Sequence, residues 1–208
     1  MRVLCLSTRN HHKLEEVAAI LEALGVRATL RSCDDFPHCP EVVEDGATLE
    51  ANATKKAREL CACTGLVTLA DDTGLEVDAL GGAPGVISAR WAGPGCTFAD
   101  NIAKLLRELR DVPEERRTAR FRCCIALASP ATPGEVTRVQ LFEGRIEGRI
   151  TMAARGQGGF GYDSVFLVEG ERRTLAELSL AAKNSLSHRA RALAAAREAI
   201  VLELSARA

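Results

Sequence analysis

The chain has 208 residues, of which 47% are hydrophobic and 26% charged, and its formal net charge is −1. This length and composition indicate one soluble globular domain that can bury a sizeable core. The charge balance excludes the strongly basic surface by which many proteins bind nucleic acid. No apolar run approaches the roughly 18 residues that span a bilayer, and the N-terminal apolar stretch is too short for a signal peptide. We therefore expect a cytoplasmic protein without nucleic-acid or membrane partners.

The first third of the chain alternates predicted strands with predicted helices. Apolar runs at 3–7, 26–30 and 66–70 predict buried strands. Helical spacing of apolar residues, followed by a glycine, predicts helices over 11–24 and 48–63. A strand, helix, strand, helix, strand order indicates an α/β protein.

The first predicted helix carries Lys13 in its first turn, directly after a Thr8-Arg9-Asn10 loop. Backbone N–H groups at a helix start and a lysine can both bind a phosphate. The loop is not a Walker motif, because the Gly-x4-Gly-Lys pattern is missing. A solvated lysine is the alternative interpretation.

Asp71 and Asp72 follow the third predicted strand directly and precede Thr73-Gly74. Two acids at the end of a buried strand are costly to desolvate unless they are paired or bind a cation. A surface turn is the alternative, since Asp, Thr and Gly all favour turns. Residues 75–80 then alternate apolar and acidic side chains, which predicts a separate half-buried strand.

The middle of the chain changes from helical periodicity to a period of two. Thr97 and Asp100 form a capping box for one more helix. Residues 119–127 alternate as a long strand does, and 136–142 and 145–151 predict two further strands. This part should therefore be antiparallel and form a second lobe.

Two stretches near the C-terminus are unusual for their length. Residues 155–163 contain four glycines and two aromatic residues and end at an acid. Glycines let a backbone approach a ligand closely, and Phe160 can stack on a base; a bulge with buried rings is the alternative. Ser187 should cap a last helix, which puts His188 and Arg189 in its first turn. Cations there oppose the helix dipole unless an anion or acceptor faces them, and a solvated turn is the alternative.

Eight cysteines are many for a cytoplasmic protein, and their spacing matches no paired zinc motif. Cys5, Cys61, Cys123 and Cys124 lie in apolar runs, and we predict that they are small core residues. A zinc site or a redox-active pair among the cysteines is the alternative.

Seven motifs occur in order along the chain: Thr8-x-Asn10-x-x-Lys13, Glu44-Asp45-Gly46-x-Thr48, Asn52-Ala53-x-x-Lys56-Ala57, Ala70-Asp71-Asp72-Thr73-Gly74-Leu75, Gly81-Gly82-Ala83-Pro84-Gly85, Gly158-Gly159-Phe160-Gly161-Tyr162-Asp163 and Ser187-His188-Arg189. As a set they resemble the Ham1-like inosine/xanthosine triphosphate pyrophosphatases over nearly the whole chain. The resemblance implies one α/β domain over 1–208, with an elongated central mixed β-sheet, flanking helices and a cleft between two lobes. It also implies a homodimer that cleaves ITP, dITP and XTP to the monophosphate and pyrophosphate with Mg²⁺, which clears deaminated purines from the nucleotide pool.

The resemblance also implies a role for each motif residue. Asp72 would activate the attacking water, and Mg²⁺ would be bound by Glu44 and Asp72, with Asp71 assisting. Phosphate oxygens would be bound by Thr8, Asn10, Lys13, Lys56 and Thr73. The base and ribose would be bound by Phe160, Gly161, Tyr162, Asp163, Lys183, His188 and Arg189. Arg9 stands where the family commonly has Gly, and it adds charge near the expected phosphate site.

Two other functions compete with this one. A Maf-like pyrophosphatase would act on pyrimidine or modified nucleotides, but the 160–163 and 187–189 motifs argue against it. A non-catalytic nucleotide-binding module would not need Glu44, Asp71, Asp72 and both lysines, because binding alone does not require so complete a set of acids.

Overall fold

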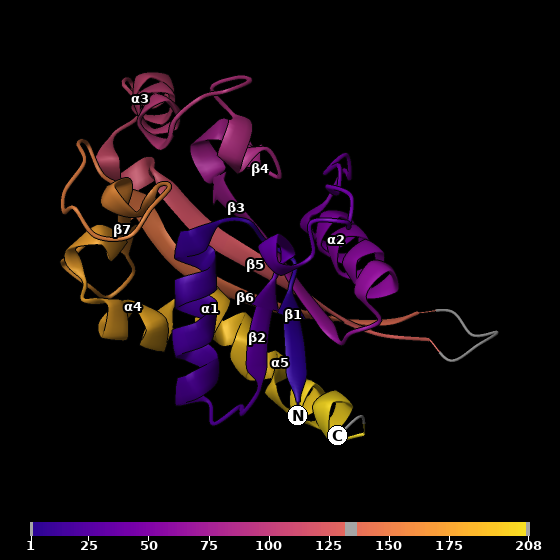
Figure 1. Ribbon diagram of the computed structural model, residues 1–208. Coiled ribbons are helices and arrows are strands. Elements are labelled where there is room, and N and C mark those ends of the chain that lie inside the picture. The colour runs from indigo at the N-terminus through magenta and orange to yellow at the C-terminus, as the bar shows by residue number, and fades with distance from the viewer. Residues whose placement is uncertain (1, 132–136, 207–208) are drawn as a thin grey trace. The chain divides into compact units, whose positions relative to one another are not determined.

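The structure is a computed structural model that describes residues 2–131 and 137–206 (Figure 1). Its helices and strands in chain order are β1 (Val3–Leu6), α1 (His11–Ala23), β2 (Thr29–Ser32), α2 (Leu49–Thr64), β3 (Thr68–Val77), β4 (Pro84–Gly85), α3 (Phe98–Glu108), β5 (Thr118–Ser129), β6 (Arg138–Ile150), β7 (Phe166–Val168), α4 (Leu180–Leu186) and α5 (His188–Ser205). Among these residues no helix has the length and apolar character needed to cross a membrane.

The strands form a mixed sheet with the order β2-β1-β3-β5-β6-β7, and β4 pairs with β3. Strand β1 is parallel to both of its neighbours, with Val3 opposite Thr29 of β2 and Cys5 opposite Thr68 of β3. Strands β3 and β4 are antiparallel, as are β6 and β7. Helices α1 and α2 connect the parallel strands, as parallel pairing requires. The predicted α/β class with a central mixed sheet and flanking helices is confirmed.

The chain divides into two compact units. Unit 1 comprises Met1–Asp72, Cys123–Gly144 and Arg189–Ala208, within the described ranges, and unit 2 comprises Thr73–Arg122 and Arg145–His188. Strands β3, β5 and β6 each contribute residues to both units. The cleft expected between two lobes stays a prediction.

In unit 1 the two faces of the sheet pack against different helices. Leu4 and Leu6 of β1 and Leu69 of β3 share a core with apolar residues of α1 and α5. Cys5, which lies between the two leucines of β1, packs instead against Leu60 of α2. Successive side chains of a strand point to opposite faces, so α1 and α5 cover one face and α2 covers the other.

Unit 2 has its own core, and Arg117 connects several of its segments. The core includes Leu75, Leu105, Phe166 and other apolar residues of β3, α3, β5, β6 and β7. Arg117 is 1% exposed, and its guanidinium donates to the carbonyl oxygen of Leu109 at 2.7 Å as well as to two further carbonyls. Leu109 follows the last turn of α3, where carbonyls lack partners within the helix.

Predicted helices match the structure better than predicted strands. The Thr48 cap and the Thr97–Asp100 capping box are present. By contrast, 66–70 and 75–80 were expected as two strands, but Thr68–Val77 form the single strand β3 and Asp78–Leu80 form a 3-10 helix, so both Asp71 and Asp72 lie inside a strand. Likewise 136–142 and 145–151 form one strand, β6, although residue 136 lies outside the described ranges. Gly74 and Gly144 do not adopt positive φ, so each strand continues through its glycine.

The cysteines combine a confirmed prediction with an unexpected bond. Cys5, Cys61, Cys123 and Cys124 are buried, as predicted. Burial raises the pKa of Cys5 and of Cys124 to about 12, which makes both thiols unreactive. Cys39 and Cys63 form a disulfide with Cα atoms 5.9 Å apart, and sequence spacing did not predict this pair.

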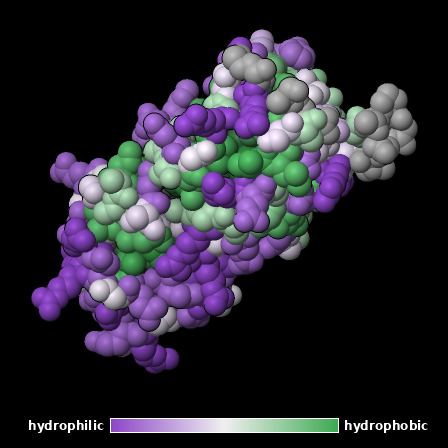
Figure 2. Space-filling view, turned by 90° about the horizontal axis from the view of Figure 1, so that it is seen from below, coloured by the Kyte–Doolittle hydropathy of each residue, from purple (hydrophilic) through white to green (hydrophobic). Residues whose placement is uncertain are grey.

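Some large hydrophobic side chains remain exposed. Figure 2 shows green hydrophobic residues among purple hydrophilic ones on the face seen from below. Among the described residues, large hydrophobic side chains that are more than two-fifths exposed include Val43, Leu141, Met152, Leu180 and Leu202. Exposed apolar groups can belong to a protein interface when they form a contiguous patch, and the homodimer stays a prediction.

Candidate active site

Asp71 and Asp72 are neighbours in β3, but they enter different polar clusters. They are 4% and 6% exposed, respectively. Asp71 Oδ2 lies 3.0 Å from Lys13 Nζ of α1 and 3.0 Å from Arg189 Nη2 of α5. Asp72 Oδ1 lies 2.9 Å from Lys56 Nζ of α2. Because consecutive strand residues point to opposite faces, these two carboxylates lie on opposite faces of the sheet.

The first cluster joins Asp72 to α2 and to the loop before it. Lys56 Nζ also lies 3.2 Å from Glu44 Oε1, so two carboxylates meet one ammonium group. One turn earlier in α2, Asn52 Nδ2 donates to Asp72 Oδ2 at 3.3 Å, and Asn52 Oδ1 accepts from Gly46 N at 2.8 Å. Residues four apart share one helix face, so α2 holds both the strand acid and the loop that carries Glu44.

The surroundings favour proton uptake by Asp72 and protonation of Lys56. Burial raises the pKa of Asp72, Lys56 opposes this shift, and Glu44 adds to it; the net pKa is above the ordinary value. Burial alone would lower the pKa of Lys56, but Asp72, Asp71 and Glu44 raise it above its ordinary value. A carboxylate with a raised pKa can accept a proton more readily, as a general base must.

The first cluster also has the donor atoms that a hard cation prefers. Glu44 and Asp72 supply carboxylate oxygens, which Mg²⁺ favours over nitrogen or sulfur. Both lie against Lys56, and Glu44 keeps 38% of its side chain exposed. Asp71 points to the other face, where cationic side chains surround it. The structure thus groups two of the three predicted metal ligands and separates the third.

The second cluster is built around Asp71 and Arg189. Arg189 is 1% exposed, and its Nε and Nη2 lie 3.4 and 3.0 Å from Asp71 Oδ2. Its Nη1 donates to Glu16 of α1, which is also buried. Burial would raise the pKa of Asp71, but Lys13, Arg189 and Lys56 hold it well below its ordinary value. We did not predict Glu16, although it lies three residues after Lys13 on the same face of α1.

The loop before α1 is ordered by its own side chains. Asn10 Oδ1 accepts from the N–H groups of two first-turn residues, one of them Lys13 at 3.3 Å. Thr8 Oγ1 accepts from Asn10 N at 3.1 Å. Arg9 is half exposed and lies 3.1 Å from Glu41. The loop therefore places Lys13 at the start of the helix without involving Arg9 in the buried clusters.

Unit 2 contains a third cluster, built from the glycine-rich loop and α4. Asp163 Oδ2 lies 2.6 Å from Lys183 Nζ and accepts from Phe160 N at 2.9 Å. The Lys183 ammonium is 4.9 Å from the centre of the Phe160 ring. The ring of Phe98 lies 6.0 Å from that of Phe160, centre to centre. A buried ion pair thus fixes a partly exposed aromatic ring.

Three other predicted residues of unit 2 have different surroundings. Tyr162 is buried, and its hydroxyl donates to Ser88 O at 2.9 Å, so its side chain is part of the core of unit 2. His188 is buried and stacks on Phe121 with ring centres 4.8 Å apart. Thr73 is half-buried in β3.

The predicted residues therefore fall into groups within each unit. Unit 1 contains Thr8, Asn10, Lys13, Glu44, Lys56, Asp71, Asp72 and Arg189. Unit 2 contains Thr73, Phe160, Gly161, Tyr162, Asp163, Lys183 and His188. Arg189, which was expected with the base-binding residues, is instead bonded to the carboxylates of Asp71 and Glu16.

Gly159 and Gly161 offer a matched test of the third cluster. Both have positive φ, but an added Cβ would overlap Asp163 Oδ2 at Gly159 and would meet nothing within 4 Å at Gly161. Gly161→Ala should cost about 1–2 kcal/mol of stability from backbone strain. Gly159→Ala should cost roughly 2 kcal/mol more, because Asp163 must leave charged and neutral hydrogen-bond partners. Urea unfolding of both variants measures the difference, and equal costs would contradict the described packing.

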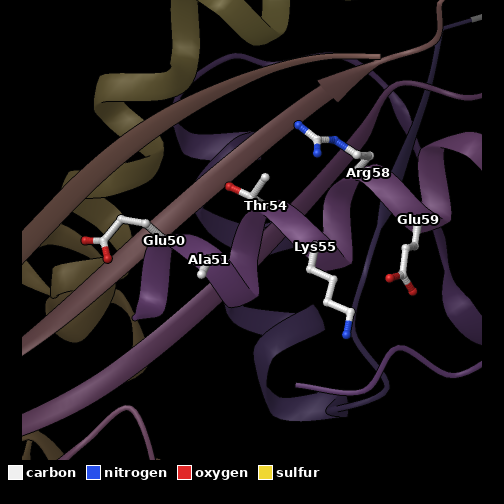
Figure 3. Close-up of a pocket in the computed structure, with 6 residues that line it drawn as sticks. All are labelled: Glu50, Ala51, Thr54, Lys55, Arg58 and Glu59. Carbon is white, nitrogen blue, oxygen red and sulfur yellow. The ribbon is translucent and has the colours of Figure 1, made fainter. Parts of the chain in front are cut away.

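An open pocket of about 390 Å³ lies against α2. It is lined by Glu50, Ala51, Thr54, Lys55, Arg58 and Glu59, all from α2 (Figure 3). None of the predicted site residues lines it. Its mixed charges do not assign it a ligand.

Comparisons with known proteins agree with the motif pattern. The family model described as the Ham1 family matches residues 4–199. The dITP/XTP pyrophosphatase of Geobacter sulfurreducens is 53% identical, over 93% of this chain and 94% of that protein. That of Shouchella clausii is 48% identical, over 96% and 97%.

Solved structures show the same similarity. A HAM1 protein from Coxiella burnetii superposes with a TM-score of 0.82 at 36% identity and covers 100% of both chains. The crystal structure of the nucleoside-triphosphatase / dITP/XTP pyrophosphatase of Mycobacterium abscessus has a TM-score of 0.72 at 47% identity, over 93% and 96% of the two chains. With a family match from the first strand into the last helix, the chain belongs to the Ham1 family.

Proposed function

We propose that this chain is a nucleoside triphosphate pyrophosphatase that hydrolyses dITP, XTP and ITP to the monophosphate and pyrophosphate. Its role would be to clear deaminated purines from the nucleotide pool. The names of relatives that share about half of their residues with this chain support this activity. The observation that carries the proposal is that Glu44 and Asp72 both lie against the buried ammonium group of Lys56.

Glu44 and Asp72 would hold Mg²⁺ through their carboxylate oxygens. The ion, when bound, neutralises phosphate charge and so favours attack on phosphorus. Asp71 was expected to assist the same ion, but its position on the other face favours a different task. We assign it to holding Lys13 and Arg189 in place.

Asp72 would act as the general base. A water proton would pass to an Oδ atom of Asp72 while the water oxygen attacks the α-phosphorus and pyrophosphate leaves. Burial favours this transfer because it raises the pKa of Asp72. Lys56, whose Nζ lies 2.9 Å from Asp72, would stabilise negative charge on the carboxylate and on the phosphate in turn.

The loop before α1 would bind the phosphates together with Lys56 and Thr73. Thr8 and Asn10 shape the loop, and Lys13 is the cation at its end. The Lys13 side chain is 18% exposed while its partner Asp71 is 3% exposed. An anion can therefore approach Lys13 from the side that faces away from Asp71.

Unit 2 would select the base. Phe160 would stack on the purine, while Asp163 and Lys183 fix the ring and contact base or ribose along with the backbone of Gly161 and Tyr162. His188 would donate to a 6-keto oxygen, which adenine lacks. A buried donor left unpaired costs about 1–3 kcal/mol, so ATP should be a poor substrate. We assign Arg189 to holding the carboxylates of Asp71 and Glu16 rather than to binding the base.

The enzyme would work as a cytoplasmic homodimer.

A substrate panel tests the activity. We expect Mg²⁺-dependent pyrophosphate release from dITP, XTP and ITP to exceed release from ATP by about 10- to 100-fold, the size expected when the buried His188 donor is left unpaired, and to exceed release from UTP as well. Comparable turnover of UTP would favour a Maf-like enzyme instead. Tight binding of dITP without release of pyrophosphate would favour a non-catalytic module.

A further inference from the structure

Four of the eight cysteines gather beside α2 in unit 1. Cys5 and Cys39 belong to one apolar cluster with Leu60, and Cys33 and Cys63 pack against that cluster. The disulfide joins two of the four. One bonded cysteine lies in the loop that precedes α2, and the other lies in the last turn of α2.

The disulfide is one of four attachments between that loop and α2. Successive loop residues pair with successively earlier residues of α2, because the loop runs antiparallel to the helix. The pairs are Cys39 with Cys63, Glu44 with Lys56, Asp45 with Lys55 and Gly46 with Asn52. The last three lie in the first half of α2, and the disulfide is the covalent attachment at the other end of the loop, where Cys39 also packs against Leu60 and Glu41 lies 3.1 Å from Arg9.

Between these attachments the loop has no regular structure of its own. Residues 40–46 form neither helix nor strand. Glu44 is in this segment, five residues after Cys39. Its position against Lys56 therefore depends on how firmly both ends of the segment are held.

We propose that Cys39 and Cys63 form a reversible thiol–disulfide site whose oxidation fixes the Glu44 loop on α2 and strengthens binding of a divalent cation by Glu44 and Asp72. The proposal rests on the proposed function for its second half only. Disulfides of proteins in reducing compartments are usually transient or redox-sensing, which is consistent with reversibility. Six cysteines remain as thiols while this pair is bonded.

The exchange partner would be a low-molecular-weight disulfide. Cys63 is half-buried and Cys39 is 7% exposed, so the Cys63 thiolate would attack first and release one small thiol. The Cys39 thiolate would then attack the Cys63 sulfur and release the second. Two electrons pass from the protein to the small disulfide, and the two protein protons end on the small thiols. An excess of small thiol reverses both steps.

His38 is placed to assist this chemistry. One of its ring nitrogens and the two sulfurs of Cys39 and Cys63 all lie within 4.8 Å of one another. A neighbouring imidazole can take the thiol proton and stabilise the thiolate, which is the reactive form. The same three residues could instead ligate a soft metal ion once the pair is reduced, and the experiment separates these outcomes.

Amide hydrogen exchange tests the loop without using the reaction. Residues 41–46 should exchange on the order of tenfold faster in protein reduced with dithiothreitol than in protein oxidised with glutathione disulfide, because ordering even one residue changes an equilibrium constant by about that factor. Calorimetric titration with Mg²⁺ should show a similar loss of affinity on reduction. Cys39→Ser should exchange quickly in both conditions. Cys33→Ser, in the same cluster, is the matched control and should keep the full response.

The outcomes separate this site from the proposed function. Equal exchange of 41–46 in both states would overturn the proposal whether or not the enzyme cleaves dITP. Unequal exchange with equal Mg²⁺ affinity would overturn the coupling to the cation. One equivalent of bound Zn²⁺ in the reduced protein, lost in His38→Ala, would show a metal site and overturn the redox assignment. Faster exchange and weaker Mg²⁺ binding support it even if another nucleotide is the substrate.

Discussion

Replacing Asp72 with Asn should lower kcat/KM for dITP by about a thousandfold, the middle of the range for loss of a general base. The amide has nearly the shape of the carboxylate, and its oxygen can still accept from Lys56 at 2.9 Å, while its NH2 group would face the Nδ2 donor of Asn52. It cannot accept a proton, and it is a poor ligand for a hard cation. The residual kcat/KM of the variant should no longer fall at acidic pH, because position 72 has no carboxylate left to protonate.

The stability of the same variant should fall less with rising pH than that of the wild type. Burial raises the folded-state pKa of Asp72 above its ordinary value. Between the unfolded and folded pKa values the folded protein binds more protons, so stability falls as pH rises through that window. Asn does not titrate, so this fall in stability should be absent from the variant. Urea unfolding across this pH window measures the stability, and the kinetic assay measures the activity.

Asp78→Asn is the control for this experiment. Asp78 is a half-exposed acid of unit 2 that lies 2.9 Å from Arg120, and its loss should leave kcat/KM within about twofold, because exposed ion pairs are worth little. If Asp72→Asn keeps more than a tenth of the wild-type activity, the assignment of the base is wrong.

Replacing Arg189 with Met should destabilise the folded protein by about 3–5 kcal/mol, the usual cost of removing one partner from a buried ion cluster. Met fills a similar length of space but leaves Asp71 and Glu16 buried without their shared cation. Arg191→Met, at an exposed position two residues along α5, is the control and should change stability by less than about 0.5 kcal/mol.

The pH dependence of this loss has a definite sign. Cationic neighbours hold the folded-state pKa of Asp71 below its unfolded value of 3.8. The resulting stabilisation is complete above that value and is lost as pH falls toward the folded pKa. The wild type and Arg189→Met should therefore differ less at about pH 3 than at neutral pH. A difference that grows on acidification would contradict the ion cluster.

The sequence predicted helices well because their signals are local. Thr48 and Thr97 each bond to the backbone of the helix that they start, so nearby residues suffice to find these helices. Strands β3 and β6 were each divided in two, since polar residues beside Gly74 and Gly144 resemble turns. Their continuity depends on hydrogen bonds to neighbouring strands, which are distant in sequence.

The sequence could predict which residues belong to the candidate site, but not which of them contact one another. Motif resemblance identified Asp71, Asp72 and Arg189 as site residues, but their pairing depends on which face of β3 each acid occupies. A continuous strand would have implied opposite faces. Glu16 could have been found from its spacing to Lys13. The disulfide could not, because it joins residues 24 apart through the tertiary fold.

The adjacent acids of β3 cannot by themselves determine which of them faces α2. If β3 slipped by one residue relative to its neighbours, every side chain would change sides, yet Asp71 would simply replace Asp72 opposite Lys56. Both positions would still hold a carboxylate. The choice comes from the apolar residues of β3, such as Leu69, whose side chain would leave the core shared with α1 and α5, and Leu75, whose side chain would leave the core of unit 2. Apolar residues that touch no nucleotide would thus decide which aspartate becomes the base, so a substitution there could exchange the two roles without altering either acid.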